Sequence, residues 1–220
     1  MPDPVRATVV DQTVEKIRDA IKHGRYAPGQ RLVEADLTLD LGASRGPLRE
    51  ALSRLSAEGL IDIEPYRGAV VRRFSRSDVV ELFEVRTALE SEAASLAAQR
   101  IDIGDHRKLM TAAVKSMGAF RSGDEHSAYP GQNSAFHATI MLIADNSLLA
   151  ELADQLHTKA YWLQFRQLLT NHTRKTSLAD HDAISSAILA GDAKKASNAM
   201  RRHIKRSLTA TLELPSGLFG

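Results

Sequence analysis

The sequence has no cysteine, few aromatic residues and no long apolar run. Without cysteine, a disulfide-stabilised fold and any cysteine-ligated zinc or iron–sulfur site are excluded. No segment reaches the roughly 18 apolar residues of a membrane-spanning helix. The first residues also lack the apolar centre of a signal peptide. We therefore expect a cytoplasmic protein.

A strong charge of one sign is also missing, because the formal net charge of the 220 residues is only +2. The net charge by itself therefore does not indicate a class of binding partner. Hydrophobic residues make up 43% of the chain, enough to bury a core, and the composition leans to helix. One local run departs from the balance: Arg67, Arg72, Arg73 and Arg76 have no acid between them. Such runs are usually solvated faces, so position in the fold must decide their role.

The first part of the chain has the order of elements of a winged helix-turn-helix domain, which we predict over 1–76. Helical spacing of apolar residues and β-like runs predict helices over 8–23, 33–41 and 44–58 and strands over 60–64 and 69–73. Gly42 suits the left-handed end of the second helix. Ser44 is the expected N-cap of the third helix, and Pro47 falls in its first turn. The segment 65–68 is the expected hairpin turn.

The rest of the chain, 77–220, is expected to be an all-α bundle, because helical periodicity continues and no strand-like run competes. The predicted helices are 77–100, 105–121, 130–144, 147–169, 176–190 and 192–212. The expected fold class is therefore mainly α. It combines an N-terminal winged helix-turn-helix with a small β-hairpin and a C-terminal all-helical bundle.

The third predicted helix has a polar first turn, with Ser44, Arg45 and Arg49, that a core helix does not need. In a helix-turn-helix, this helix lies in the major groove with its N-terminal residues toward base edges. Arginine matches the acceptor pair of guanine, and serine can bond to a base or a phosphate. Arg67 at the hairpin tip could reach the minor groove or the DNA backbone. The two arginines at the hairpin base are phosphate contacts or solvated charges.

Three of the eight histidines, His137, His181 and His203, are the polar members of otherwise apolar helical stripes. Helices of a bundle turn such stripes inward, where facing side chains can build a metal site. Asn133 lies four residues before His137, so both share one helix face. A single such histidine is more often a hydrogen-bonded core residue. With three on three helices, core residues and a site are equal alternatives.

Residues 8–74 resemble the DNA-binding domain of GntR-family bacterial transcription regulators, through IRDAIKHGRYAPGQRLVEADLTLDLGASRGPLREALSRLSAEGLIDIEPYRGAVVRRFS. The remainder resembles the FadR-type effector domain, or FCD domain, through LFEVRTALE, NSAFHATI, HDAISSAILAGD and MRRHI. The resemblance implies a homodimer on a short palindromic operator, acting as a repressor that a small organic acid releases. The DNA contacts that it implies are Ser44, Arg45, Gly46, Arg49 and Gly68.

The same resemblance implies a metal site, because many FCD domains bind a divalent metal through one aspartate and three histidines. His137, His181 and His203 match the histidines, whereas Asn133 stands at the position of the aspartate. An amide oxygen is neutral, so the site loses one negative charge and should bind metal more weakly. Three imidazoles and an amide suit Zn²⁺ or Ni²⁺. We expect zinc, with nickel as the alternative, and a carboxylate effector that offsets the positive charge.

Arg86, in EVRTALE, is the candidate effector contact, because a guanidinium in a bundle pocket can bind a carboxylate through two parallel hydrogen bonds. From spacing alone, a surface ion pair with Glu90 four residues on is an equal alternative, and the resemblance favours the pocket. Trp162 and its aromatic neighbours Tyr161 and Phe165 are expected in the core or the pocket wall.

Two other functions fit part of the pattern. A metalloenzyme with a metal-bound water would explain the histidines, but not the winged helix, and the sequence shows no general base beside them. A metal-free regulator would bind its effector directly through the three histidines, and chelators would leave that binding intact. Our main expectation is a non-enzymatic DNA-binding regulator in which the effector shifts helix 77–100.

Overall fold

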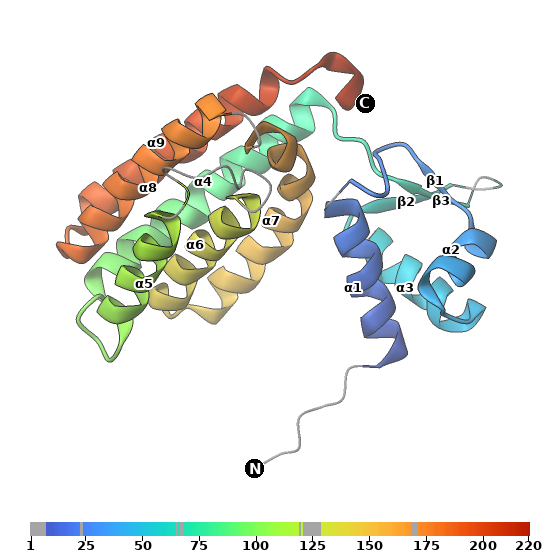
Figure 1. Ribbon diagram of the computed structural model, residues 1–220, viewed down its shortest axis with the longest axis horizontal. Helices are drawn as coiled ribbons and strands as arrows, with labels where there is room; N and C mark the ends of the chain where they lie inside the picture. The colour runs from blue at the N-terminus through green and yellow to red at the C-terminus, as the bar shows by residue number, and fades with distance from the viewer. Residues whose placement is uncertain are drawn as a thin grey trace, which may run out of the picture. The chain divides into compact units, whose positions relative to one another are not determined.

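The computed structural model describes residues 8–22, 24–64, 66, 68–118, 120, 129–168 and 171–220, with side chains outside 158–172. The chain forms two compact units (Figure 1). One comprises Met1–Phe74 with Gly217–Gly220, and the other comprises Ser75–Ser216. The expected division after residue 76 assigns the C-terminal tail, Gly217–Gly220, to the second part of the chain. In the structure the tail groups with the first unit, where Gly220 N–H donates to the Phe74 carbonyl (3.1 Å).

The first unit contains the three predicted helices. They are α1 (Val9–Lys22), α2 (Glu34–Leu41) and α3 (Arg45–Ala57). Gly42 ends α2 in the left-handed conformation (φ 66°), which a residue without Cβ adopts at little cost. Ile17 of α1, with Leu48 and Leu55 of α3, is completely buried in one hydrophobic core. The apolar spacing of each helix therefore correctly predicts its buried face.

The sheet of the first unit has three antiparallel strands rather than the two expected. It has the order β1–β3–β2, with β1 at Arg31–Leu32, β2 at Ile61–Glu64 and β3 at Gly68–Val71. Leu32 pairs with Ala69 and is buried. The hairpin prediction is confirmed, and β1 was missed because two residues are too short to show alternation.

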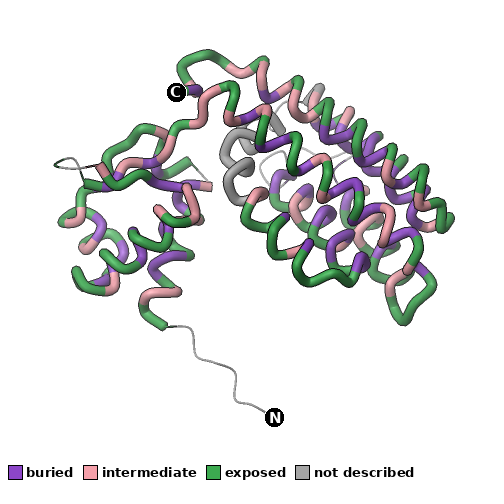
Figure 2. The backbone as a smooth tube through the Cα atoms, turned by 180° about the vertical axis from the view of Figure 1, so that it is seen from behind, coloured by how far each residue is buried: buried purple, intermediate pink, exposed green. Residues whose placement is uncertain are grey.

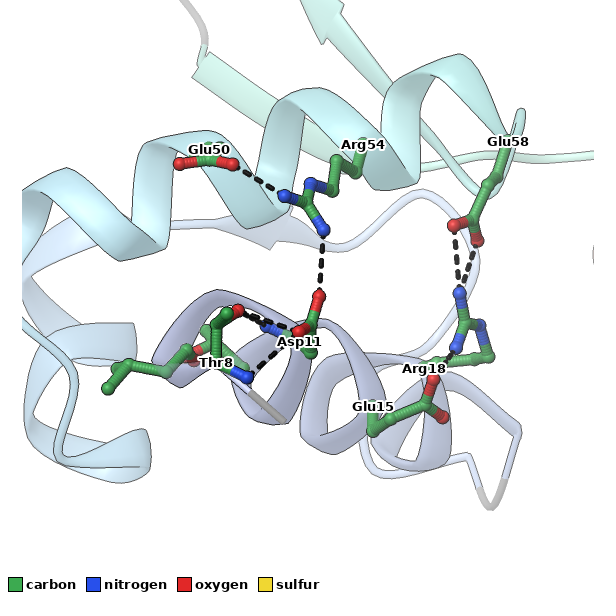
Figure 3. Close-up of polar contacts among 9 residues, drawn as sticks. Thr8, Asp11, Glu15, Arg18, Glu50, Arg54 and Glu58 are labelled. Carbon is green, nitrogen blue, oxygen red and sulfur yellow. Dashed lines mark hydrogen bonds and ion pairs between the residues drawn. The ribbon is translucent and has the colours of Figure 1, made fainter. Parts of the chain in front are cut away.

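Ion pairs tie α1 to α3 on the surface of this unit (Figure 3). Arg54 of α3 contacts Asp11 (2.8 Å) and Glu50 (2.6 Å), and Arg18 of α1 donates to both carboxylate oxygens of Glu58 at 2.8 Å. Thr8 and Asp11 cap the start of α1 by bonding each other's backbone N–H. Because exposed pairs contribute little free energy, the core rather than these contacts stabilises the unit.

Tyr26→Phe is expected to destabilise the first unit by about 1 kcal/mol, the usual net value of one hydrogen bond. The Tyr26 hydroxyl donates to Asp40 at 2.6 Å. Burial, followed by this bond, raises the pKa of Tyr26 from 10.0 to about 12. A raised pKa means that the contribution is complete below pH 10 and lost as the pH rises toward 12. Thermal unfolding followed by circular dichroism would show this, and an unchanged alkaline profile in the variant would contradict it.

The second unit is all-helical in its described residues, as predicted. Its helices are α4 (Arg76–Gln99), α5 (His106–Gly118), α6 (Tyr129–Ala144), α7 (Ser147–Leu168), α8 (Asn171–Leu189) and α9 (Ala193–Leu212). Helix α8 begins five residues before the predicted start at 176. A short 3-10 turn, Ser216–Leu218, follows α9. Within the described chain, none of the helices could cross a bilayer.

Helix α4 runs through the middle of this bundle (Figures 1 and 2) and contacts α6, α7, α8 and α9. Ser75 and Asp78 form a capping box that starts the helix. Ala93, Ala94 and Ala97 are completely buried, and their small side chains let neighbouring helices approach closely. A helix that is covered on several sides also buries its polar residues, and these contribute to the candidate site.

Candidate functional site

The polar first turn of α3 lies on the surface of the first unit. Ser44 is the N-cap (φ −72°, ψ 162°), but its side chain makes no capping hydrogen bond. Ser44, Arg45, Gly46 and Arg49 are all exposed. A Cβ at Gly46 would meet no atom within 4 Å, so the surface is open there. The turn can therefore offer hydroxyl, guanidinium and backbone N–H groups to an external ligand.

Glu34, at the start of α2, pairs with Arg49. Arg49 Nε lies 3.0 Å from both carboxylate oxygens of Glu34. Because the pair is exposed, its net stabilisation is small, but it restrains the direction of the guanidinium. Sequence reasoning missed this contact, since the two residues are 15 positions apart on different helices.

The wing residues are only partly described. Gly68 begins β3 with φ +79°, a conformation that disfavours side chains, and it is exposed. Arg67 lies outside the described residues. Of the two arginines at the hairpin base, Arg72 lies over the ring of Phe74 (5.4 Å), and Arg73 Nε is 3.4 Å from a backbone carbonyl oxygen.

In the second unit, His137, His181 and His203 converge from α6, α8 and α9, as the sequence predicts. All three are buried, and one ligand atom of each lies within 4.8 Å of the others. The Nε2 atoms of His203 and His137 are 3.3 Å apart. Among the residues whose side chains are described, neither ring nitrogen of His181 has a hydrogen-bond partner, and buried Asn133 likewise has none for its Oδ1. The ring of His181 stacks on Phe136 with centroids 4.2 Å apart.

In the cluster of His137, His181 and His203 (the His cluster), the surroundings of His137 and His181 favour the neutral imidazole of each. Burial lowers the pKa of His137 to about 4, against the opposing effect of Glu90. Burial and then the charges of His203 and His137 hold the pKa of His181 well below its ordinary value. Neutral imidazole is the form that binds metal. Buried polar atoms without partners are rare in native proteins, and a divalent cation would engage these lone pairs. The donors present therefore fit a metal.

Arg86 is buried, and it also pairs with Glu90. The ion pair that the spacing suggests therefore forms inside the bundle and not on its surface. The Arg86 side chain is only 2% exposed, and Nε donates to Glu90 Oε1 at 2.9 Å. Its Nη1 atom has no hydrogen-bond partner among the described side chains. One edge of the guanidinium therefore remains able to bind an anion.

Glu90 and His157 lie next to His137, and sequence reasoning missed both. Glu90 is completely buried and accepts a hydrogen bond from His137 Nδ1 at 2.6 Å. His157 of α7 places Nε2 3.1 Å from Glu90 Oε1, but not in a direction that makes a hydrogen bond. Burial alone would raise the pKa of Glu90, yet Arg86 and the two histidines hold it well below the ordinary value. The only sequence signal was the spacing of Arg86 and Glu90, which exposed pairs share.

The structure does not describe the three aromatic side chains expected in the core or the pocket wall. The side chains of Tyr161, Trp162 and Phe165 lie outside the described residues.

Comparisons with known proteins find a family match for each of the two parts of the chain. Residues 9–71 match the family described as bacterial regulatory proteins, gntR family, and residues 81–206 match the FCD domain. The transcriptional regulator LutR of Bacillus subtilis is 30% identical, over 90% of this chain and 97% of its own. The transcriptional repressor GlaR of Escherichia coli is 27% identical, over 86% of this chain and 89% of its own.

Among solved structures, Escherichia coli McbR/YncC superposes with a TM-score of 0.80. It is 19% identical and covers 94% of this chain and 98% of its own, so this likeness concerns the fold alone. The two matched families span both units, and nothing among the relatives supports the metalloenzyme alternative. The chain therefore belongs to the GntR family of bacterial regulatory proteins, as a DNA-binding transcription regulator with an FCD domain.

Proposed function

We propose that the protein is a repressor that binds a palindromic operator as a homodimer and responds to a small carboxylate through a divalent metal. The observation that carries this proposal is the His cluster, in which three buried imidazoles meet. Asn133, four residues before His137 on α6, is also buried, and its Oδ1 has no hydrogen-bond partner among the described residues. A site that recognises a small polar ligand needs buried polar groups that are free to bind it. A core with no binding role normally has hydrogen-bond partners for all its buried polar groups.

The proposed DNA contacts are Ser44, Arg45, Gly46 and Arg49 in α3 and Arg67 and Gly68 in the wing. The exposure of the α3 residues supports this assignment. Dimeric helix-turn-helix proteins bind two half-sites about one helical turn apart, so a palindromic operator follows from the proposed dimer. Such a protein would work in the cytoplasm. The name of GlaR as a repressor supports repression.

The proposed metal ligands are His137, His181 and His203, with the amide oxygen of Asn133. Imidazole and amide ligands suit Zn²⁺, and Ni²⁺ is the alternative. A bound divalent cation would supply a coordination position for a carboxylate. Because four neutral ligands leave the charge of the cation uncompensated, the site favours an anionic effector more strongly than a site with aspartate.

Arg86 is the proposed second contact of the effector. Its burial supports this role, and so does its Nη1 atom, which has no hydrogen-bond partner in the described part of the bundle. A guanidinium inside a low-dielectric bundle binds a carboxylate strongly. Helix α4 carries Arg86 and follows β3 through residues 72–75. An effector that shifts α4 would therefore change how the recognition helices of a dimer meet their half-sites. In the metal-free alternative, the same effector would bind in the presence of chelator.

The test is elemental analysis of purified, tag-free protein, before and after zinc is offered. We expect about one zinc per chain in the wild type and a loss of most of it in His181→Ala, since one of three imidazole ligands is removed. His106→Ala is the matched control, because His106 lies on α5 and bonds the Arg100 carbonyl. No metal in the wild type after zinc is offered would refute the metal site. Equal metal in wild type and His181→Ala would show that other residues hold it.

A further inference from the structure

We propose that Glu90 is a positioning residue that fixes His137 for metal binding, an inference that rests on the metal site proposed above. Glu90 lies on α4, outside the His cluster, and its side chain is completely buried. Its Oε2 atom is 2.6 Å from His137 Nδ1. Among the described residues, no other member of the His cluster contacts a carboxylate this closely. The next contact is that of His203 Nδ1 with Asp180, at 3.5 Å.

The two ring nitrogens of His137 face different groups. Nδ1 faces Glu90, and Nε2 faces His203 Nε2 at 3.3 Å, inside the His cluster. An ionised carboxylate only accepts hydrogen bonds, so the proton of neutral His137 belongs on Nδ1. The lone pair of Nε2 is then directed into the cluster. This is the carboxylate–histidine–metal arrangement, which orients the ring and makes the ligand nitrogen more basic.

Glu90 is itself held in place. Arg86, one turn earlier on α4, donates from Nε to Glu90 Oε1 at 2.9 Å, which leaves Oε2 for His137. With both side chains buried, solvent neither screens the contact nor competes for it. Asn133 supplies no negative charge to the metal directly, so a carboxylate behind His137 is the nearest anionic support in the described part of the site.

A competing arrangement uses Glu90 as a direct ligand. Glu90, His137 and His157 also place one ligand atom each within 4.8 Å of one another. In that set, the Nδ1 atom of His137 and Glu90 Oε1 are already engaged in hydrogen bonds. In the His cluster, both nitrogens of His181 lack hydrogen-bond partners in the part of the chain whose side chains are described. The geometry therefore favours the His cluster as ligands and Glu90 as the support.

The first experiment titrates zinc-free, full-length protein with Zn²⁺ against a competing chromophoric chelator. Glu90→Gln should bind zinc about 10- to 100-fold more weakly than the wild type, the usual effect of losing such a support. Ser91→Ala, a buried polar change at the next position of α4, should bind as the wild type does. His157→Gln should also leave zinc affinity unchanged. If His157→Gln weakens binding as much as Glu90→Gln, Glu90 is a direct ligand and the inference is wrong.

A second readout does not depend on a variant that folds. Long-range ¹H–¹⁵N correlation spectra of the wild type with zinc should show His137 protonated on Nδ1 and metal-bound through Nε2. The opposite assignment would overturn the inference. Wild-type affinity in Glu90→Gln would overturn it too, while leaving the metal site standing. No zinc binding by the wild type would instead refute the metal site, and the inference with it.

Discussion

Arg45→Ala and Arg49→Ala will each weaken operator binding by about 1–3 kcal/mol, roughly 5- to 150-fold. Both side chains lie exposed within the first two turns of α3, the part of a recognition helix that meets base edges. Neither belongs to the hydrophobic core of the first unit, so the variants should keep its fold. Arg49 also loses its pair with Glu34, but that pair is exposed and contributes little.

The measurement is fluorescence anisotropy with DNA that the wild type selects from a random pool, over a range of salt concentrations. A phosphate contact lowers the salt slope by about one, whereas a base contact mainly relaxes sequence preference. Arg54→Ala is the matched control, since Arg54 lies on the same helix and faces Asp11 and Glu50 (Figure 3). Wild-type affinity in both test variants would refute the assignment of α3 as the recognition helix.

Arg86→Met will destabilise the second unit by about 3–5 kcal/mol, because it removes one partner of a buried ion pair. Glu90 is completely buried, and Arg86 is the cation that neutralises it. Methionine has a similar length and fills the space, so the lost charge rather than a cavity causes the effect. The fluorescence of Trp162, the single tryptophan of the chain, should follow urea unfolding of this unit.

The double variant Arg86→Met/Glu90→Gln separates charge from packing. It leaves no unpaired buried charge, so we expect it to recover more than half of the stability lost by Arg86→Met alone. If the double variant is less stable than Arg86→Met, packing rather than ion pairing explains the loss. If Arg86→Met unfolds at the wild-type urea concentration, the pair does not stabilise the fold at all.

Local rules explain what could be predicted from the sequence. The apolar spacing of α1 and α3 reflects a repeat within one helix, and Gly42 ends α2 because its backbone conformation is a local matter. The shared face of Asn133 and His137 follows from a separation of four residues. The motifs of both families are also contiguous, so the type of regulator was recognisable before the structure.

Contacts between distant segments depended on tertiary structure. Strand β1 forms because Arg31 and Leu32 meet β3, about 40 positions later. Arg86 and Glu90 have the spacing of an ordinary surface pair, and only the position of α4 inside the bundle buries them. His137 reaches Glu90 across 47 positions, and His203 meets His137 across 66. Periodicity gives the face of each helix, but the packing of whole helices decides which faces meet, and no local pattern encodes that choice.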